Sequence, residues 1–191
     1  MSPNNIIEKK IDELNKNLKE IKNISKKFPK QKKLQFHARD LKNDKKVKKI
    51  LDEKLSNNTK NVIYIFEISN INLKKLHNCF DKFSTTNKKL SKTDTRRINL
   101  SKHNKEHNSN YLYVGSKRKN FKRRIKEHIG TNNNRTFAMH LKDWVPKLPA
   151  MKIKIIYYTF NNKIKNEEVL QIIEDAYWDY CMPILGKKGH N

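Results

Sequence analysis

The stretch "LYVGSKRKNFKRRIKEHIG", residues 112–130, joins a strand-like run to a basic helix through one glycine turn. The run before Gly115 is rich in aromatic and β-branched side chains, which is typical of a strand. We expect Asn120 to cap a helix over residues 121–129, and Gly130 follows where a left-handed helix stop costs least. The stretch therefore predicts a strand, a turn and a helix in direct succession.

Two other runs have the composition of strands. Residues 62–68, "VIYIFEI", are rich in β-branched and aromatic side chains. Residues 151–160, "MKIKIIYYTF", alternate apolar and basic positions with the period of two that marks a half-buried strand. Helices are expected over residues 73–83, 135–144 and 167–181. This order of strands and helices, with mixed connections, predicts an α+β domain rather than a doubly wound sheet.

Residues 1–60 predict an N-terminal helical extension ahead of a domain over residues 61–191. Residues 6–24 carry apolar side chains at alternating steps of four and three, the stripe of an amphipathic helix. We expect this stripe to pack against the body, with dimerisation as the alternative; its members are Ile7, Ile11, Leu14, Leu18 and Ile21. A second, more polar helix is expected over residues 36–56. Residues 69–110 form an insertion in the domain, and its polar second part is expected to be a long loop or extended connection.

The chain of 191 residues carries 44 Lys and Arg against 19 Asp and Glu, a net charge of +25 with a pI near 10.0. Such an excess predicts a polyanionic partner, nucleic acid before an anionic membrane. Only seven basic residues are Arg, so a skewed base composition of the source genome is the alternative explanation. The sequence has neither an apolar span nor a secretion signal, which favours the cytoplasm. Two cysteines, Cys79 and Cys181, support neither a disulfide framework nor a cysteine zinc site.

The helix predicted after the glycine turn carries a candidate chemical face. Arg124 and His128 are four residues apart and so project from one side. The buried side of the same helix is formed by Phe121, Ile125 and Ile129. A guanidinium fork matches phosphate oxygens, and an imidazole can move a proton near neutral pH. The alternative is a solvated basic face without chemistry.

Glu174 interrupts the apolar stripe of the last predicted helix. It lies between Leu170 and Tyr177 and beside Ile173, on a helix that Asn166 is expected to cap. A buried carboxylate is costly unless something pairs with it. A hard divalent cation such as Mg²⁺ would pair with it through oxygen, and an arginine is the equal alternative.

Tyr64 and Tyr113 lie on predicted strands, where a lone tyrosine is typically a core or edge residue. Together with Arg124, His128 and Glu174 they form a set suited to hydrolysing a phosphodiester. In that reaction a metal neutralises charge on the phosphate, an arginine stabilises the transition state and a base activates water. The reference pKa of tyrosine is about 10. We expect nearby cations to lower the tyrosine pKa by favouring the phenolate.

At these positions the sequence resembles the GIY-YIG nuclease family. "VIY" at 62–64 stands for the first motif and "YVG" at 113–115 for the second. The F-x-x-R-x-x-x-H pattern that starts at Phe121 looks like the arginine helix of the family. "LQIIEDAYW" places Glu174 like the metal-binding glutamate, and "MPILGKKGHN" resembles the segment that follows it. The N-terminal helices have no counterpart in the family.

The resemblance implies a compact domain around a small three-stranded antiparallel sheet flanked by helices, which cuts DNA with one Mg²⁺ or Mn²⁺ ion per active site. By the same resemblance, the site consists of Tyr64, Tyr113, Arg124, His128, Glu174 and, to complete it, Asn191. Either tyrosine would activate or hold the water, and the arginine would grip the scissile phosphate. The histidine would orient a tyrosine or assist proton transfer, and the glutamate would bind the metal.

The sequence therefore leads to the hypothesis of a cytoplasmic, metal-dependent DNA endonuclease of restriction type, as suits a small free-standing chain. Repair and mobile-element nicking are alternative roles. The candidate contacts to double-stranded DNA are Lys117, Arg118, Lys122, Arg123 and Arg135. A homodimer, formed through the N-terminal helices or on DNA, is left open. The rivals of another class are a non-catalytic nucleic-acid-binding protein on the same fold and an RNA-binding accessory protein.

Overall fold

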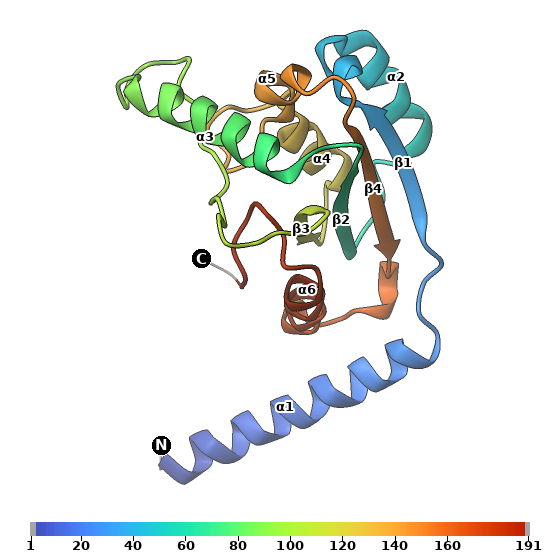
Figure 1. The fold of residues 1–191 in the computed structure, drawn as a ribbon. Coiled ribbons are helices and arrows are strands. Elements are labelled where there is room, and N and C mark those ends of the chain that lie inside the picture. Colours follow the sequence, from blue (N-terminus) through green and yellow to red (C-terminus); the bar gives the residue numbers. More distant parts are fainter. Residues whose placement is uncertain (1–2, 190–191) are drawn as a thin grey trace.

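The computed structural model describes residues 3–189, which contain one four-stranded antiparallel sheet (Figure 1). Its strands lie in the order β1-β4-β2-β3. They are β1 (Lys32–His37), β2 (Val62–Ser69), β3 (Tyr111–Lys117) and β4 (Lys152–Thr159). The predicted α+β class is confirmed. The prediction of three strands is one too few, because β1 pairs with β4.

Helices cover both faces of this sheet. They are α1 (Pro3–Lys26), α2 (Asp44–Lys54), α3 (Leu73–Lys89), α4 (Phe121–Ile129), α5 (Leu141–Trp144) and α6 (Glu167–Cys181), with 3-10 turns at Ala38–Lys42, Val145–Lys147 and Asn161–Lys163. Side chains alternate between the faces of a strand. Phe66 of β2 and Ile155 of β4 therefore point into the larger core, with α2, α3, α4 and α5. Ile63 and Ile65 of β2 point to the other face, which α6 covers. Within residues 3–189, no helix combines the length and the apolar character needed to cross a bilayer.

The predicted helix over residues 36–56 is wrong over its first third. β1 ends only at His37, and a 3-10 turn separates it from α2. Leu34 and Phe36 alternate with exposed neighbours and are buried against β4, the pattern of a strand rather than a helix. α2 begins where Asn43 caps it, with the Asn43 side chain accepting a hydrogen bond from the Lys46 backbone N–H at 3.0 Å.

Two further details around α4 and α5 correct the sequence prediction. Asn120 does not cap α4 with its side chain and instead adopts a left-handed conformation with φ of 60°. The bounds of α4 are nevertheless those predicted, and Gly130 ends it at φ of 94°. The helix predicted over residues 135–144 is limited to the four residues of α5. The residues before α5 are not helical, because Ala138 forms an isolated bridge with Leu100 and its backbone N–H donates to the Asn99 carbonyl at 3.1 Å.

Helix α1 runs beneath the body, and its N-terminal half projects away from it (Figure 1). The predicted packing of its apolar stripe against the body is wrong for four of the five members. Between 50% and 59% of the surface of each is exposed in Ile7, Ile11, Leu14 and Leu18. Ile21 is partly buried against the α6 side of the sheet. The reason is that a polar face of α1 makes the contacts with the body.

β3 lies at an edge of the sheet, and this decides where the functional side chains meet. In the register of β2 with β3, Tyr64 lies opposite Gly115. The segment after α6 continues beside β3, where the Ile184 backbone N–H donates to the Tyr111 carbonyl at 2.9 Å. Elements from both faces of a sheet can approach each other around an edge strand. Residues of α4 and α6 are thereby brought to the same place.

Candidate active site

A pocket of about 700 Å³ opens beside β3. Four of the six predicted site residues line it, namely Tyr64 from β2, Tyr113 from β3, Arg124 from α4 and Glu174 from α6. The four side chains belong to four different elements on both faces of the sheet. The fold therefore gathers around one space residues that lie far apart in the sequence.

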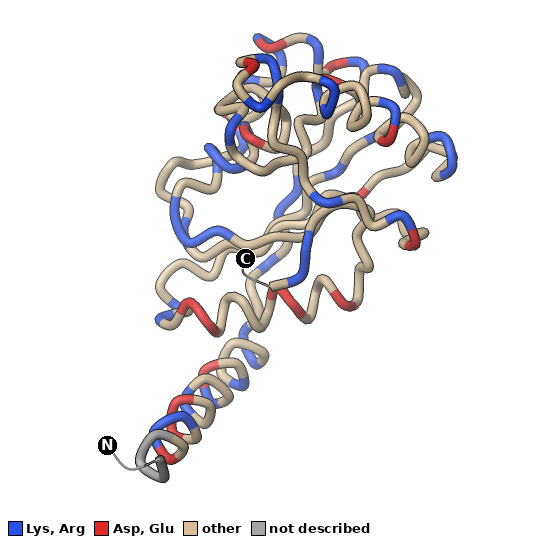
Figure 2. The backbone as a smooth tube through the Cα atoms, turned by 90° about the vertical axis from the view of Figure 1, so that its left-hand side faces the viewer, with Lys and Arg blue, Asp and Glu red and all other residues tan. Residues whose placement is uncertain are grey.

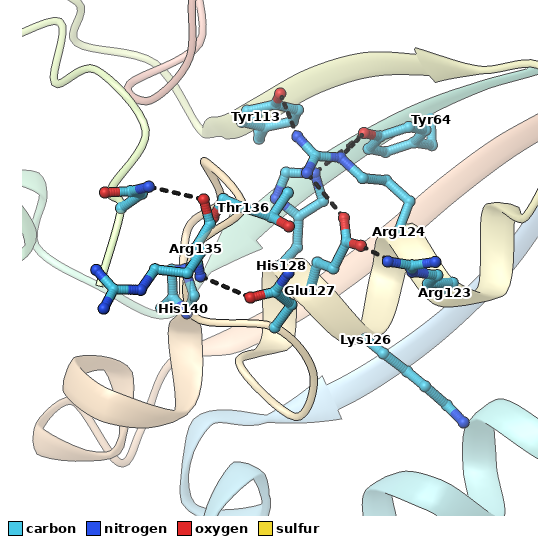
Figure 3. A network of polar contacts seen from close by, with 12 residues as sticks. Tyr64, Tyr113, Arg123, Arg124, Lys126, Glu127, His128, Arg135, Thr136 and His140 are labelled. Atoms are coloured by element: carbon cyan, nitrogen blue, oxygen red, sulfur yellow. Dashed lines mark hydrogen bonds and ion pairs between the residues drawn. The ribbon is translucent and has the colours of Figure 1, made fainter. Parts of the chain in front are cut away.

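Arg124 is the centre of a hydrogen-bond network in this pocket (Figure 3). Its Nε donates to Tyr64 Oη at 3.3 Å, and its Nη2 donates to Tyr113 Oη at 3.4 Å. Its Nη1 donates to Glu127 Oε2 at 3.1 Å. A guanidinium has five N–H donors, so these three bonds leave two donors for a ligand in the pocket. The network fixes the orientation of Arg124 before any ligand arrives.

Sequence reasoning missed Glu127, which supports Arg124 from behind (Figure 3). Only 7% of Glu127 is exposed, and its other carboxylate oxygen accepts from Arg123 Nε at 3.2 Å. A buried carboxylate is costly unless it is paired, so the two arginines hold it in place. The signal was present in the sequence, because Glu127 follows these arginines by four and three residues on one helix face.

His128 lies behind Tyr64, in contact with that tyrosine but outside the pocket wall. Its Nε2 is 3.0 Å from Tyr64 Oη, and its ring is completely buried. Arg124 already donates to the same hydroxyl, so the hydroxyl proton is free to be donated to His128 Nε2. Within residues 3–189, His128 Nδ1 has no hydrogen-bond partner. His128 can therefore act on the pocket only through Tyr64 and is not among the residues that line it.

Burial dominates the titration of the site, which corrects the expected effect of the cations. Burial raises the pKa of Tyr64 far above its ordinary value, and the neighbouring Arg124 offsets this only in part. The pKa of Tyr113 is raised for the same reason. Burial, and then the charge of Arg124, holds the pKa of His128 well below 6.5. At neutral pH the site thus presents two neutral phenols and a neutral imidazole to one guanidinium.

Two glycines allow the tyrosines to lie this close to the backbone. A Cβ on Gly115 would lie 2.6 Å from Tyr64 Oη and 2.8 Å from Tyr113 Cε1. A Cβ on Gly186 would lie 3.0 Å from Tyr113 Cε2, and Gly186 also has φ of 111°. Side chains at either position would displace a tyrosine ring. The glycine of the second motif thus has a steric role that the spacing of the motif alone did not indicate.

Glu174, on α6, is half-buried in the pocket wall. Within residues 3–189, no three His, Cys, Asp or Glu side chains are grouped so that they could hold a metal ion. Mg²⁺ does not need such a group, because it keeps several waters and is commonly held by one or two carboxylates together with substrate phosphates. One carboxylate beside a pocket of this size fits an ion that binds together with a phosphate. Glu174 is the residue that would hold it.

Three of the predicted DNA contacts lie close to the pocket. Lys117 lines it at the end of β3. Arg118 follows directly, with its Nη1 3.4 Å from Glu167 Oε2 on an exposed surface. Arg123 precedes Arg124 on α4, and 62% of its side chain is exposed. All three can reach a polyanion that enters the pocket from this side.

The other predicted residues lie elsewhere. Lys122 forms an ion pair with Asp52 at 2.7 Å, and 14% of its side chain is exposed, so it is directed toward α2 rather than into the pocket. Arg135 is on an exposed loop, where its Nη1 donates to the Lys92 carbonyl at 3.3 Å. Asn191 lies outside the described residues.

Further residues that sequence reasoning did not name as site residues complete the pocket wall. Ser101 and Lys102 come from the insertion, and Lys187 comes from the segment after α6. These segments are joined by a hydrogen bond from the Gly186 backbone N–H to the Lys102 carbonyl at 2.9 Å. Nothing in the sequence pairs residues this far apart. The insertion therefore contributes to the pocket and is not a detached loop.

No family model, no curated protein and no solved structure matches this chain. The resemblance to the GIY-YIG nucleases therefore stays a prediction from short motifs. Function has to be argued from the geometry and charge of the pocket.

Proposed function

We propose that the protein is a divalent-metal-dependent endonuclease that hydrolyses phosphodiester bonds in double-stranded DNA. The observation that carries the proposal is the pocket in which Tyr64, Tyr113, Arg124 and Glu174 surround one space of about 700 Å³. A guanidinium and a carboxylate that line the same space suit a phosphate that shares a metal ion with the protein.

In the proposed reaction, water attacks the phosphorus, a new P–O bond forms and the bond to the leaving sugar oxygen breaks. Arg124 stabilises the negative charge that builds on the non-bridging oxygens, through the two N–H donors that the network leaves available. Glu174 would hold the metal ion, which would supply further charge neutralisation at the phosphate. The leaving oxygen takes a proton from solvent.

Tyr64 is the base in this proposal, and its contact with His128 supports the role. Because burial keeps the pKa of Tyr64 high, its hydroxyl is protonated in the free protein. It accepts the proton of the attacking water only as it passes its own proton to His128 Nε2, 3.0 Å away. The Tyr113 hydroxyl contacts Arg124 instead, so its role is to hold the guanidinium.

The charge around the pocket favours one direction of approach for DNA. α6 contains no Lys or Arg and five acidic residues, whereas basic residues are spread over the rest of the body (Figure 2). Lys102 from the insertion and Lys117 at the end of β3 both line the pocket. A phosphate backbone would therefore contact these lysines as it crosses β3 and would avoid the acidic surface of α6 except at Glu174 in the pocket wall.

The experiment is incubation of the purified protein with plasmid and genomic DNA, with Mg²⁺ or with EDTA. Glu174→Ala and Arg124→Ala are compared with Asp179→Ala, which removes a carboxylate from the same helix outside the pocket. We expect cleavage that requires metal, that is lost in the first two variants and that is kept in the third. Mapping the ends of the fragments then separates restriction-type cleavage from repair or nicking.

Duplex binding is measured on the same proteins, so that loss of cutting is distinguished from loss of contact. Glu174→Ala is expected to bind DNA as well as the unchanged protein does, since it removes a negative charge. If Glu174→Ala cuts at the unchanged rate, Glu174 has no part in the reaction.

A non-catalytic DNA-binding protein is the second candidate, favoured because Glu174 is the single carboxylate among the described residues that line the pocket. In that case the basic residues that line the pocket bind the phosphate backbone of DNA, and the pocket catalyses no reaction. DNA that is shifted on a gel and stays intact with Mg²⁺ and with Mn²⁺ would support this candidate. Preference for single-stranded RNA over duplex DNA at equal salt would instead favour an RNA-binding role.

A further inference from the structure

Helix α1 is attached to the body by one face, which combines buried polar contacts with the apolar contacts of Ile21 and Ile24. The Asn17 side chain is 2% exposed, donates to Glu168 Oε2 at 2.8 Å and accepts from Asn166 Nδ2 at 2.8 Å. One turn further on, Glu20 Oε1 accepts from the Lys165 backbone N–H at 2.8 Å. These bonds join α1 to the N-terminal end of α6. They also fix the rotation of α1 about its own axis.

That rotation leaves an apolar face of α1 without a partner in the described chain. We call it the exposed stripe, and it consists of Ile7, Ile11, Leu14 and Leu18. Half or more of the surface of each is exposed, whereas Ile21 and Ile24 at the C-terminal end of the helix are packed against the body. The stripe cannot turn inward without breaking the buried hydrogen bonds of Asn17. Four large apolar side chains in one row on an exposed helix mark an interaction surface.

The spacing of the exposed stripe is the same in both directions along the helix. The steps between its members are four, three and four residues. Two such helices packed antiparallel bring Ile7 opposite Leu18 and Ile11 opposite Leu14, and the same pairs recur by symmetry. Each layer then joins one β-branched side chain to one leucine, with knobs of one helix in holes of the other. The surface is self-complementary, as a two-fold interface between identical chains requires.

We propose that the exposed stripe binds a second copy of this chain, with the two α1 helices antiparallel. The positions beside the stripe are compatible with this pairing. Glu8 and Asn15 flank one side, and Lys10 and Asn17 flank the other. In the antiparallel register Glu8 comes beside Asn15 of the second copy, and Lys10 comes beside the position of Asn17, whose side chain is covered by α6 of its own chain. No like charges meet along either side.

The antiparallel orientation also suits the charge of the whole chain. Each copy carries a net charge of +25, so two bodies at the same end of a helix pair would repel each other. An antiparallel pair places them toward opposite ends. The interface does not depend on the proposed cleavage. If both proposals hold, the pair supplies two pockets to one duplex.

The first test is sedimentation equilibrium of the full chain without DNA, over a wide range of protein concentration in high salt, which screens the repulsion. We expect a reversible monomer–dimer equilibrium. Leu14→Ser should shift it to monomer, whereas Lys16→Ser, two residues away on the same exposed helix and outside the stripe, should not. A monomer at every concentration overturns the proposal, and so does equal association of the two variants.

The second test determines the orientation and uses single cysteines at the two ends of the stripe in a Cys79→Ser background, where the remaining Cys181 is buried. In the antiparallel pair, residue 7 lies opposite residue 18, and the two residues 7 are about 16 Å apart along the axis. A disulfide requires Cα atoms within about 7 Å.

An equimolar mixture of Ile7→Cys and Leu18→Cys chains, oxidised under native conditions, should therefore give the mixed disulfide. Ile7→Cys alone should stay monomeric on a non-reducing gel. Disulfide formation by Ile7→Cys alone indicates a parallel pair and refutes the antiparallel interface. Absence of any disulfide from the mixture refutes the interface as well. Neither readout uses cleavage, so failure here leaves the endonuclease proposal to its own test.

Discussion

Replacing Gly115 by alanine perturbs the pocket without removing any of its functional groups. The added Cβ would lie 2.6 Å from Tyr64 Oη, and ordinary van der Waals contact begins at 3.4 Å. The hydroxyl would therefore have to move by about 0.8 Å (3.4 − 2.6), away from its bonds with Arg124 and His128. A misplacement of roughly 1 Å in an active site can cost about a hundredfold in rate. We expect Gly115→Ala to cut DNA about a hundred times more slowly.

The same crowding destabilises the fold by about 1–3 kcal/mol, so the control must lose stability without touching the tyrosines. Val114→Ala is such a control, because Val114 packs with Ile65 and Cys181 on the α6 side and its truncation costs about 2 kcal/mol. Single-turnover cleavage of an end-labelled duplex is measured beside urea unfolding for both variants. Equal cleavage rates for the two would refute the claim that the packing of Tyr64 against β3 sets the rate.

Three further predictions concern the network, the partner and the pH dependence. Arg124→Lys keeps the positive charge but cannot replace the three directed hydrogen bonds of the guanidinium. The cleavage rate should therefore fall about a hundredfold or more while duplex binding stays nearly unchanged. Retained cleavage would show that the guanidinium geometry is not required. Duplex affinity should fall steeply with salt, and Lys102→Ala should reduce the slope of log binding constant against log salt concentration by about one. Lys122→Ala should leave this slope unchanged, because the Lys122 ammonium is paired with Asp52. An affinity that does not change with salt would argue against phosphate contacts. The pKa of His128 is lowered from 6.5, so below that pH the unfolded chain binds a proton that the folded chain does not. The free energy of unfolding should therefore decrease as pH falls from about 6.5, by up to about 1.4 kcal/mol per pH unit. In urea unfolding at several pH values, His128→Gln should reduce the pH dependence of the free energy of unfolding. Part of the pH dependence that remains comes from His140, whose pKa is also lowered. An unchanged pH dependence would contradict the lowered pKa of His128.

The sequence predicted those elements whose local pattern is strong. β2 and β4 have dense β-branched and aromatic content, and α4 and α6 have clear ends, with Gly130 and the Asn166 cap as expected. β1 was missed because it offers only Leu34 and Phe36 among lysines, and two apolar residues do not separate a strand from the start of a helix. Its pairing with β4 makes it a strand, and pairing is a long-range property.

The same division applies to the pocket. Glu174 could be selected from the sequence because it interrupts an apolar stripe, whereas Tyr64 and Arg124 were selected together with it as a set that resembles the family motifs. Their convergence at β3 depends on strand order and register, which no local pattern encodes. The contributions of Glu127 and Lys102 follow from packing in three dimensions. The prediction that the pKa of the tyrosines is lowered was wrong for the same reason, because only the structure reveals how completely Tyr64 and Tyr113 are buried.

The measurement that tests the central claim most directly is a time course of an end-labelled duplex with the unchanged protein and with Glu174→Ala, each with Mg²⁺, with Mn²⁺ and with EDTA. The account predicts strand cleavage by the unchanged protein that requires metal, and no cleavage by Glu174→Ala at equal binding. A duplex that is fully bound by the unchanged protein and remains intact with both metals would contradict it.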